Sequence, residues 1–412
     1  METINTYYDD YVSLEEFIKN NHNLLAVNNR AVLVQIFCGI GDKNRILNIS
    51  EQIRGLIPRA HVIGSTTSGE IMNGWVSGLK TVLSFSVFRQ SEIKTAFLAK
   101  RDKDDYGLGQ TIAAELNSDK AKLLILFATG LTINGSQFLK GVQSVNADLP
   151  VAGGIAGSNR TDRQSFVCCN QNITDCGVVG AVLEGNNLTV TRHTHLGWKP
   201  IGKEMTITRA DDSRVYTIDN IPAYQVYYRY LGIETDSNVF KVFEFPLIVH
   251  RHGLTMARAP FMRYADDSIL FFGDIAEGEK VRFGFAHVRL ILEKVDSLRQ
   301  MIAKQPVESI FVYSCASRRG FLQESAQLET LPLQNIAPTA GFFTSGEFYH
   351  INGSNQFLNN AMTTLTLSES GPQTFWTQQT KTTPGYIEPG QKNNSIKNHD
   401  ADRNIEILKA LT

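Results

Sequence analysis

The tetrapeptide Thr-Ser-Gly-Glu occurs twice in this chain, at residues 67–70 and at residues 344–347. The shift between the copies is 277 positions (344 − 67), and the same shift carries Cys38 onto Cys315 without a gap. Each cysteine ends an apolar, strand-like run, and each tetrapeptide follows a second such run. Identical spacing fixes the lengths of the strands, the intervening helix and the loop together. We therefore expect two related halves, each built on a repeated β-α-β-β unit.

A weaker third copy lies 90 positions after the first. It keeps the glycines that an unusual backbone needs, because Gly64 aligns with Gly154 here and with Gly341 in the second copy. It loses the polar side chains that a shared chemistry would need, since Glu70 aligns with Arg160. We interpret this copy as scaffold.

These units predict an α/β fold with mixed sheets flanked by helices. From about Gly371 the composition turns polar and rich in Thr, Gln, Asn and Pro, which is typical of a linker. Ile405, Leu408 and Leu411 then recur at helical spacing, so we expect the start of a truncated connecting helix that leads into another domain. The predicted division is a helical lead-in (1–29), an N-terminal domain (30–219), a C-terminal domain (220–370), a polar linker (371–400) and the connecting helix (401–412).

Composition narrows the class of protein. With 412 residues, 42% hydrophobic and 20% charged, the chain has the make-up of a soluble globular protein. A net charge of −1 supplies no field that would attract nucleic acid. No apolar run approaches the roughly 18 residues of a membrane-spanning helix, and the N-terminus lacks the pattern of a signal peptide. We therefore expect a cytoplasmic protein without a membrane span and without a nucleic-acid partner.

Seven short segments, in this order and spacing over more than 300 residues, resemble the FIST sensory domains. They are GSTTSGEI at 64–71, GGIAG at 153–157, GWKPIG at 197–202, YYRYLG at 227–232, FGDI at 272–275, SCASRR at 314–319 and GFFTSGEF at 341–348. The resemblance implies an N-terminal and a C-terminal FIST half that together sense a small molecule and are not themselves an enzyme. It further implies a partner histidine kinase of a two-component system or a fused output domain such as a diguanylate cyclase. The connecting helix could support a homodimer.

One branch of this family resembles haem-binding nitric oxide sensors, which makes haem the cofactor to consider. The chain has nine histidines and no Cys-x-x-Cys-His motif, so haem would be bound without a covalent bond. His350, three residues beyond Glu347, is the candidate iron ligand on position alone. Two further histidine pairs, at 193/195 and 250/252, would share a strand face and chelate a metal, or would simply be exposed strand residues.

The second repeat copy is the predicted ligand site. It alone combines a pair of arginines after its first strand with a serine and a glutamate after its second, and a guanidinium binds a carboxylate or phosphate at two points. The alternative is a structural turn whose charged groups pair with each other. The predicted ligand-binding residues are Ser314, Cys315, Arg318, Arg319, Ser345 and Glu347.

A rival function is a cysteine- or serine-dependent hydrolase that uses the repeated loops. Cys38 and Cys315 each end a strand beside a turn, where backbone amides can activate a thiol. A nucleophile also needs a positioned base, and no histidine occupies equivalent positions in both halves. Because cysteine is among the most buried residue types, packing is the simpler explanation. We predict no catalytic residue.

Overall fold

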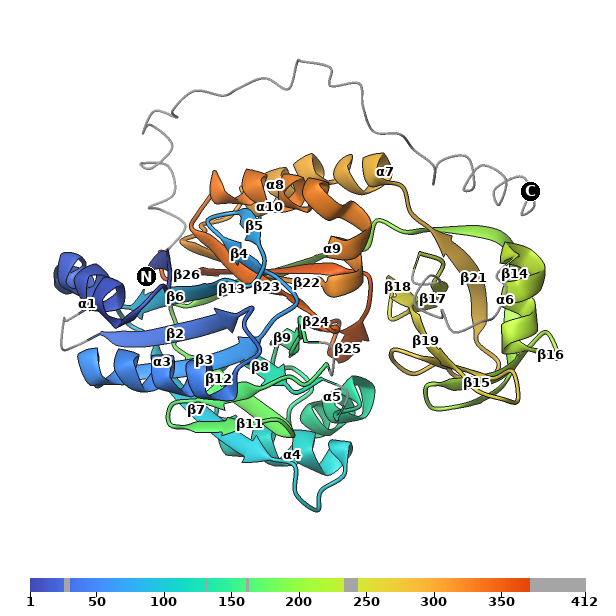
Figure 1. Ribbon diagram of the computed structural model, residues 1–412, viewed down its shortest axis with the longest axis horizontal. Helices are drawn as coiled ribbons and strands as arrows, with labels where there is room; N and C mark the ends of the chain where they lie inside the picture. The colour runs from blue at the N-terminus through green and yellow to red at the C-terminus, as the bar shows by residue number, and fades with distance from the viewer. Residues whose placement is uncertain (26–29, 131, 161–162, 233–243, 371–412) are drawn as a thin grey trace.

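The computed structural model describes residues 1–25, 30–130, 132–160, 163–232 and 244–370. The described residues form four β-sheets, of which three share one strand order and surround a common core (Figure 1). The linker and connecting helix predicted beyond residue 370 lie outside the described residues. Within the described part of the chain, no helix has the length and apolar character needed to cross a bilayer.

The first sheet contains the first repeat copy and has the strand order β1-β6-β2-β3-β10-β11. β2 and β3 run parallel because helix α3 connects them, and β6 returns antiparallel to β2. The helices of this unit are α1 (Tyr11–Asn20), α2 (His22–Leu25) and α3 (Lys43–Leu56). The strands are β1 (Glu2–Tyr7), β2 (Ala31–Cys38), β3 (Ala60–Thr66), β6 (Thr81–Phe88), β10 (Val167–Cys169) and β11 (Asn172–Thr174).

The third repeat copy builds a complete sheet of the same order, β7-β12-β8-β9-β24-β25. Again the first and second strands of the unit, β8 and β9, are parallel and β12 returns antiparallel. The helices are α4 (Asp105–Leu116) and α5 (Gly135–Val145). The strands are β7 (Glu92–Ala99), β8 (Ala121–Ala128), β9 (Val151–Ile155), β12 (Gly177–Glu184), β24 (Glu347–Ile351) and β25 (Ser354–Leu358).

The second Thr-Ser-Gly-Glu copy lies in a sheet of order β13-β26-β22-β23-β4-β5. β22 and β23 are parallel and β26 is antiparallel to β22, as in the other two units. The helices are α7 (Val288–Leu292), α8 (Val295–Ile302), α9 (Ala316–Leu322), η2 (Gln323–Ala326) and α10 (Gln327–Gln334). The strands are β13 (Thr189–His195), β22 (Ser309–Cys315), β23 (Thr339–Thr344), β26 (Met362–Ser368), β4 (Glu70–Met72) and β5 (Trp75–Ser77).

Each unit lends its β-hairpin to a neighbouring sheet. The hairpin β4–β5 of the first unit pairs with β23, the hairpin β24–β25 pairs with β9, and the hairpin β10–β11 pairs with β3. This cyclic exchange joins the three units in a ring, which we call the three-sheet body. It also brings the loop between the second strand and the hairpin of every unit to one end of the body.

The inward faces of the three sheets enclose one apolar core. Phe37, Phe127 and Phe342, one from each sheet, meet there with ring centroids 5.2 to 6.3 Å apart. The helices cover the outer faces, where α3, the α4–α5 pair and the α8–α10 group each close a separate apolar cluster. Because both faces of the central strands are covered, these strands read as continuous apolar runs in the sequence.

A fourth, antiparallel sheet is inserted between β13 and α7 and lies to one side of the body (Figure 1). Helix α6 (Ala223–Leu231) packs on it in an apolar cluster that also includes Tyr349, Leu358 and Ala361 of the body. Its strands are β14 (Lys199–Asp211), β15 (Arg214–Ile218), β16 (Ile221–Pro222), β17 (Leu247–Arg251), β18 (Leu254–Arg258), β19 (Pro260–Arg263), β20 (Ile269–Phe271) and β21 (Lys280–Phe285). The boundary expected near residue 220 falls between β15 and α6, so both sequence-defined domains contribute strands to the inserted sheet.

The α/β class predicted from the sequence is confirmed, with mixed sheets flanked by helices and a shared strand order and direction in both Thr-Ser-Gly-Glu halves. The third copy, however, is a full member of the ring. The lead-in also begins with β1, which pairs with β6, before its helices.

Candidate functional site

The Thr-Ser-Gly-Glu sequence folds into the same turn in both copies. Thr67 Oγ1 donates a hydrogen bond to Glu70 Oε1 at 2.5 Å, and Thr344 Oγ1 donates to Glu347 Oε1 at 2.6 Å. In each copy the glycine N–H donates to the threonine hydroxyl. Thr, Gly and Glu are buried in both turns, and the half-buried serine is the exception. The motif is therefore a structural turn that presents one serine.

The glycine of the motif is required by its backbone. Gly69 has φ +144° and Gly346 has φ +152°, a region that side chains with a Cβ rarely adopt. A Cβ on Gly346 would also lie 2.3 Å from the ring of Phe357. Ser68 and Ser345, at the second position of the motif, do not have a positive φ, so serine fits there without this backbone strain.

Three serines at equivalent positions of the three units line one cavity. A shift of 90 positions carries Ser68 onto Ser158, and a shift of 277 carries it onto Ser345. All three line a cavity of about 540 Å³, which we call the central cavity. The third copy, which we interpreted as scaffold alone, thus contributes to the candidate site. The ring of exchanged hairpins is the cause, because it gathers the three loops at one end of the body.

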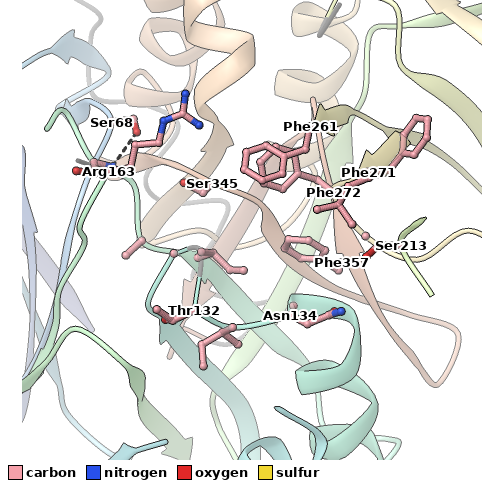
Figure 2. A pocket seen from close by; sticks show the side chains of 18 of the residues that line it. Ser68, Thr132, Asn134, Arg163, Ser213, Phe261, Phe271, Phe272, Ser345 and Phe357 are labelled. Carbon is pink, nitrogen blue, oxygen red and sulfur yellow. Dashed lines mark hydrogen bonds between the residues drawn. The ribbon is translucent and has the colours of Figure 1, made fainter. Parts of the chain in front are cut away.

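The remaining walls come from α5 and from the inserted sheet. Figure 2 shows Ser68, Arg163 and Ser345 on one side and the phenylalanines of the inserted sheet on the other. The start of α5, with Asn134 as its cap, closes the cavity below. The lining residues contributed by the inserted sheet are Ser213, Phe261, Leu270, Phe271, Phe272 and Gly273.

The serine hydroxyls differ in how they are engaged. Ser68 Oγ accepts a hydrogen bond from the backbone N–H of Ser158 at 3.1 Å. Ser158 Oγ donates to the Gln164 carbonyl at 2.7 Å. The Ser345 hydroxyl makes no hydrogen bond to another described residue, although the Ser345 N–H donates to the Ile155 carbonyl. Ser345 is therefore the serine best placed to bind a ligand.

Positive charge predominates among the described charged residues of the lining. Arg160 and Arg163 follow Ser158 in the loop of the third copy and both line the cavity. The Arg160 guanidinium is anchored by a bond from Nη1 to Gly41 O at 3.1 Å. The acidic group, Asp105, forms an ion pair with Lys100 at 2.8 Å.

The six residues predicted as a ligand site are distributed over three environments. Ser345 lines the central cavity. Arg319 is half-buried in a second, more open cavity of about 660 Å³ between α9 and the β4–β5 hairpin, and it donates to the Ser68 carbonyl. The other four residues are buried in the protein and line neither cavity: Ser314, Cys315, Arg318 and Glu347.

Burial governs the chemistry of Cys315 and Glu347. It raises the pKa of the Cys315 thiol to about 12, and the neighbouring Glu347 carboxyl adds to the rise. Burial also raises the pKa of Glu347 well above its ordinary value. The Cys315 thiol is therefore protonated near neutral pH, and the Glu347 carboxyl keeps its proton to a higher pH than an exposed glutamate does. A protonated, buried thiol is the opposite of what the hydrolase alternative requires of a nucleophile.

The central cavity does not fit haem. Haem iron takes an axial His, Cys, Met or Tyr, and none of the described residues lining this cavity is of these types. His350 lies on β24, where it is buried and its Nδ1 is 2.8 Å from Asn355 Oδ1. In the described parts of the chain, no three His, Cys, Asp or Glu side chains gather as a metal site.

Sequence reasoning missed the aromatic wall and both lining arginines. The alignment of Ser158 with Ser68 was a usable signal for the third loop, and Arg160 and Arg163 lie close beyond it. No comparable signal marks Phe261 or Phe272, because the inserted sheet has no counterpart in the repeat.

Comparison with known proteins agrees with the motif pattern. The FIST N domain model matches residues 32–221, and the FIST C domain model matches residues 223–350. Among curated proteins, no sequence matches the chain significantly. Two solved structures show weak likeness, a cyanuric acid hydrolase from A. caulinodans (10% identity, 89% of this chain and 99% of that chain covered, TM-score 0.33) and a chorismatase (7% identity, 89% and 98% covered, TM-score 0.31). Neither likeness is close enough to assign an activity. The two family matches span most of the sequence, and the chain belongs to the FIST family, whose members are sensory domains of signal transduction.

Proposed function

We propose that this sensory domain binds a small molecule in the central cavity and reports its occupancy through a shift of the inserted sheet against the three-sheet body. The observation that carries the proposal is the shared wall of the cavity. Ser68, Ser158 and Ser345 belong to the body, whereas Phe261 and the other phenylalanines on its side belong to the inserted sheet. A ligand in contact with both parts favours the arrangement in which both contacts exist.

The interface between the two parts combines polar contacts with the apolar packing of Tyr349, Leu358 and Ala361 of the body against the inserted sheet. Asp212 accepts hydrogen bonds of 2.7 Å from the side chains of Asn134 and Gln137 at the start of α5. Asp274 pairs with Lys140 of α5 at 3.2 Å. The polar bonds exchange readily with water, which favours a reversible shift of the two parts.

Of the residues predicted from the sequence, we propose Ser345 as a ligand contact. Arg319 supports the cavity indirectly, because it holds the Ser68 carbonyl and thereby the turn that presents the Ser68 hydroxyl. Ser314, Cys315, Arg318 and Glu347 act through the packing beneath the loops.

We further propose that the domain works in the cytoplasm and signals to a histidine kinase or to a fused output domain such as a diguanylate cyclase. The support is the family, whose members are sensory domains of signal transduction. Residues 371–412 would carry the signal and could form a homodimer.

The test is mass spectrometry of small molecules that remain bound to the purified native protein, followed by binding measurements with the molecule found. Ser213→Trp places a large side chain in the cavity wall, and Glu277→Trp adds the same side chain at an exposed position of the inserted sheet. We expect the first variant to lose the ligand and the second to keep it. If both variants retain the ligand equally, the central cavity is not the binding site.

A further inference from the structure

We propose that the second cavity, between α9 and the β4–β5 hairpin, binds a small oxyanion, a carboxylate or a phosphate, through Arg319, and that Ser68 couples this site to the central cavity. The anion site lies outside the central cavity, and only the coupling rests on the proposed function.

Arg319 has unused hydrogen-bond donors. Within the described part of the chain, its guanidinium makes one hydrogen bond, from Nη1 to the Ser68 carbonyl, and no ion pair. A guanidinium carries five N–H groups, so those of Nε and Nη2 have no acceptor among the described residues. The same edge of the neighbouring Arg318 holds the Glu329 carboxylate at two points. The open edge of Arg319 therefore matches two oxygens of a carboxylate or phosphate.

Two glycines give the Arg319 guanidinium its place. A Cβ on Gly69 would lie 2.7 Å from Nη1, and a Cβ on Gly78 would lie 2.7 Å from Nη2. The guanidinium carbon is also 5.7 Å from the centroid of the Phe343 ring. A group held in this way loses little further freedom when a ligand binds, which favours affinity.

Two carboxyl groups lie around Arg319, and neither forms an ion pair with it. Glu70 is buried, and its oxygens accept hydrogen bonds from Thr67 Oγ1 at 2.5 Å and from the Lys80 N–H at 3.0 Å. Burial raises the pKa of Glu70 and the charge of Arg319 opposes that rise, so Glu70 offsets part of the positive charge. Glu324 is exposed at the cavity wall, where its negative charge repels an anion. Removal of the Glu324 charge should therefore strengthen anion binding.

Neutral polar groups complete the wall of the second cavity. Ser77, Gln323 and Gln327 line it, and the amides of both glutamines make no side-chain hydrogen bond to a described residue. Each amide can donate two N–H groups to the oxygens of an anion. The volume of about 660 Å³ is in the range of sites for small molecules.

Ser68 is shared by the two cavities. Its carbonyl accepts from Arg319, and its hydroxyl accepts from the Ser158 N–H at 3.1 Å. An anion that fixes the Arg319 guanidinium therefore also fixes the Ser68 turn and its bond to Ser158. By linkage, a ligand of the central cavity that favours the same turn geometry raises the affinity for the anion by the same factor by which the anion raises its own.

The experiment combines thermal unfolding and calorimetric titration of the full chain with sodium phosphate and with sodium acetate, at an ionic strength matched by sodium chloride. At least one probe should raise the unfolding temperature, because a ligand that binds only the folded protein stabilises it. The probe that binds more tightly identifies the head group. If neither probe exceeds the effect of sodium chloride, the inference is wrong.

Variants assign the bound anion to the second cavity. Arg319→Ala should weaken binding of the tighter probe about tenfold or more, with partial rescue by Arg319→Lys. Because Arg319→Ala also removes the bond to Ser68, Glu324→Gln supplies an independent measurement at an exposed residue, and it should bind the probe roughly twofold more tightly or better. Arg289→Ala is the control, since Arg289 is 82% exposed and pairs with Glu293. Unchanged binding in Arg319→Ala, or binding in Glu324→Gln no tighter than in wild type, would contradict the anion site.

Ser213→Trp separates the two cavities. It should leave binding of the tighter probe unchanged, and loss of that binding would place the anion in the central cavity and overturn the second site. Hydrogen exchange at the Ser158 amide tests the coupling: the probe should slow it in wild type and not in Arg319→Ala. Exchange that the probe does not alter in wild type overturns the coupling. If Ser213→Trp and Glu277→Trp retain the ligand of the central cavity equally, the proposed function fails while the anion site at Arg319 stands.

Discussion

Arg318 and Glu329 form a two-point ion pair that is almost completely removed from solvent. Arg318 Nε donates to Glu329 Oε2 at 2.7 Å and Nη2 donates to Oε1 at 2.5 Å, with side-chain exposures of 0% and 2%. The remaining nitrogen, Nη1, donates to the carbonyls of Leu196 and Asn360. The guanidinium therefore ties α9 to α10, to the chain before the inserted sheet and to the loop before β26.

Arg318→Ala should lower the free energy of unfolding by about 3 to 5 kcal/mol, because it leaves the Glu329 carboxylate buried without its partner. Urea unfolding measures the loss. Arg319→Ala is the matched control, since its guanidinium is half-buried and it should cost much less. Unchanged stability of Arg318→Ala together with weaker ligand binding would support the ligand contact predicted from the sequence.

Glu347→Gln should change how stability depends on pH. The folded pKa of Glu347 lies well above the ordinary 4.5, so the unfolded chain releases this proton while the folded chain keeps it. Wild-type stability therefore falls as the pH rises above about 4.5, by up to about 1.4 kcal/mol per unit, until the folded pKa is reached. The glutamine variant lacks this loss. Urea unfolding between about pH 5 and 8 should show that the free energy of unfolding of the wild type falls relative to that of the variant as the pH rises.

Glu70→Gln is the repeat-equivalent control for that measurement. Burial raises the pKa of Glu70 as well, but its bonds to Thr67 and to the N–H of Lys80, and the charge of Arg319, oppose the rise. The same sign with a smaller slope is expected. Parallel pH profiles for wild type and Glu347→Gln would show that Glu347 is ionised in the folded protein.

Asp274→Asn should loosen the inserted sheet from α5. Burial disfavours the charge of Asp274, but the positive charges of Arg258, Arg251 and Lys140 outweigh it and hold its pKa well below the usual range. The carboxylate therefore contributes stability that is present above its ordinary pKa of 3.8 and is lost as the pH falls further. We expect a loss of about 2 kcal/mol at neutral pH, between the values for exposed and buried pairs.

Hydrogen exchange should locate that loss at the start of α5. Asp219→Asn is the control, because Asp219 pairs with Lys203 within the inserted sheet and does not contact α5. Faster exchange in α5 with Asp219→Asn, or unchanged exchange there with Asp274→Asn, would contradict the assignment of the interface.

The cysteines should react slowly in the native protein. Cys38, Cys168, Cys169 and Cys315 are buried, and burial raises the pKa of each, to about 11 for Cys169. Cys176 is the half-buried exception. Titration with a thiol reagent should modify Cys176 first, and Cys176→Ser should remove this phase. Rapid modification of both Cys38 and Cys315 would revive the nucleophile hypothesis.

The sequence predicted the repeat well because the spacing from Cys38 to Glu70 is local. It could not predict that three units exchange hairpins in a ring, since that pairing joins strands such as β4 and β23 that lie far apart in the chain. Arg318 was interpreted as a ligand contact because its partner Glu329 lies on another helix and the burial of both is set by tertiary packing. Local patterns therefore located the turns, and long-range packing decided which of their neighbours face the central cavity.

Gly346→Ala should destabilise the protein by more than 2 kcal/mol, through backbone strain at φ +152° and through a Cβ placed 2.3 Å from the Phe357 ring. Gly232→Ala is the matched control: Gly232 also has positive φ, +61°, but a Cβ there would meet nothing within 4 Å. Backbone strain at φ +61° is smaller than at φ +152°, and the expected cost is about 1 kcal/mol. Urea unfolding measures the loss of stability in each variant. Because Phe357 also lines the central cavity, Gly346→Ala should in addition weaken ligand binding, whereas Gly232→Ala should not. A loss of stability in Gly346→Ala no larger than that in Gly232→Ala would contradict both the backbone strain and the close approach of Phe357 as reasons for glycine in the Thr-Ser-Gly-Glu turn.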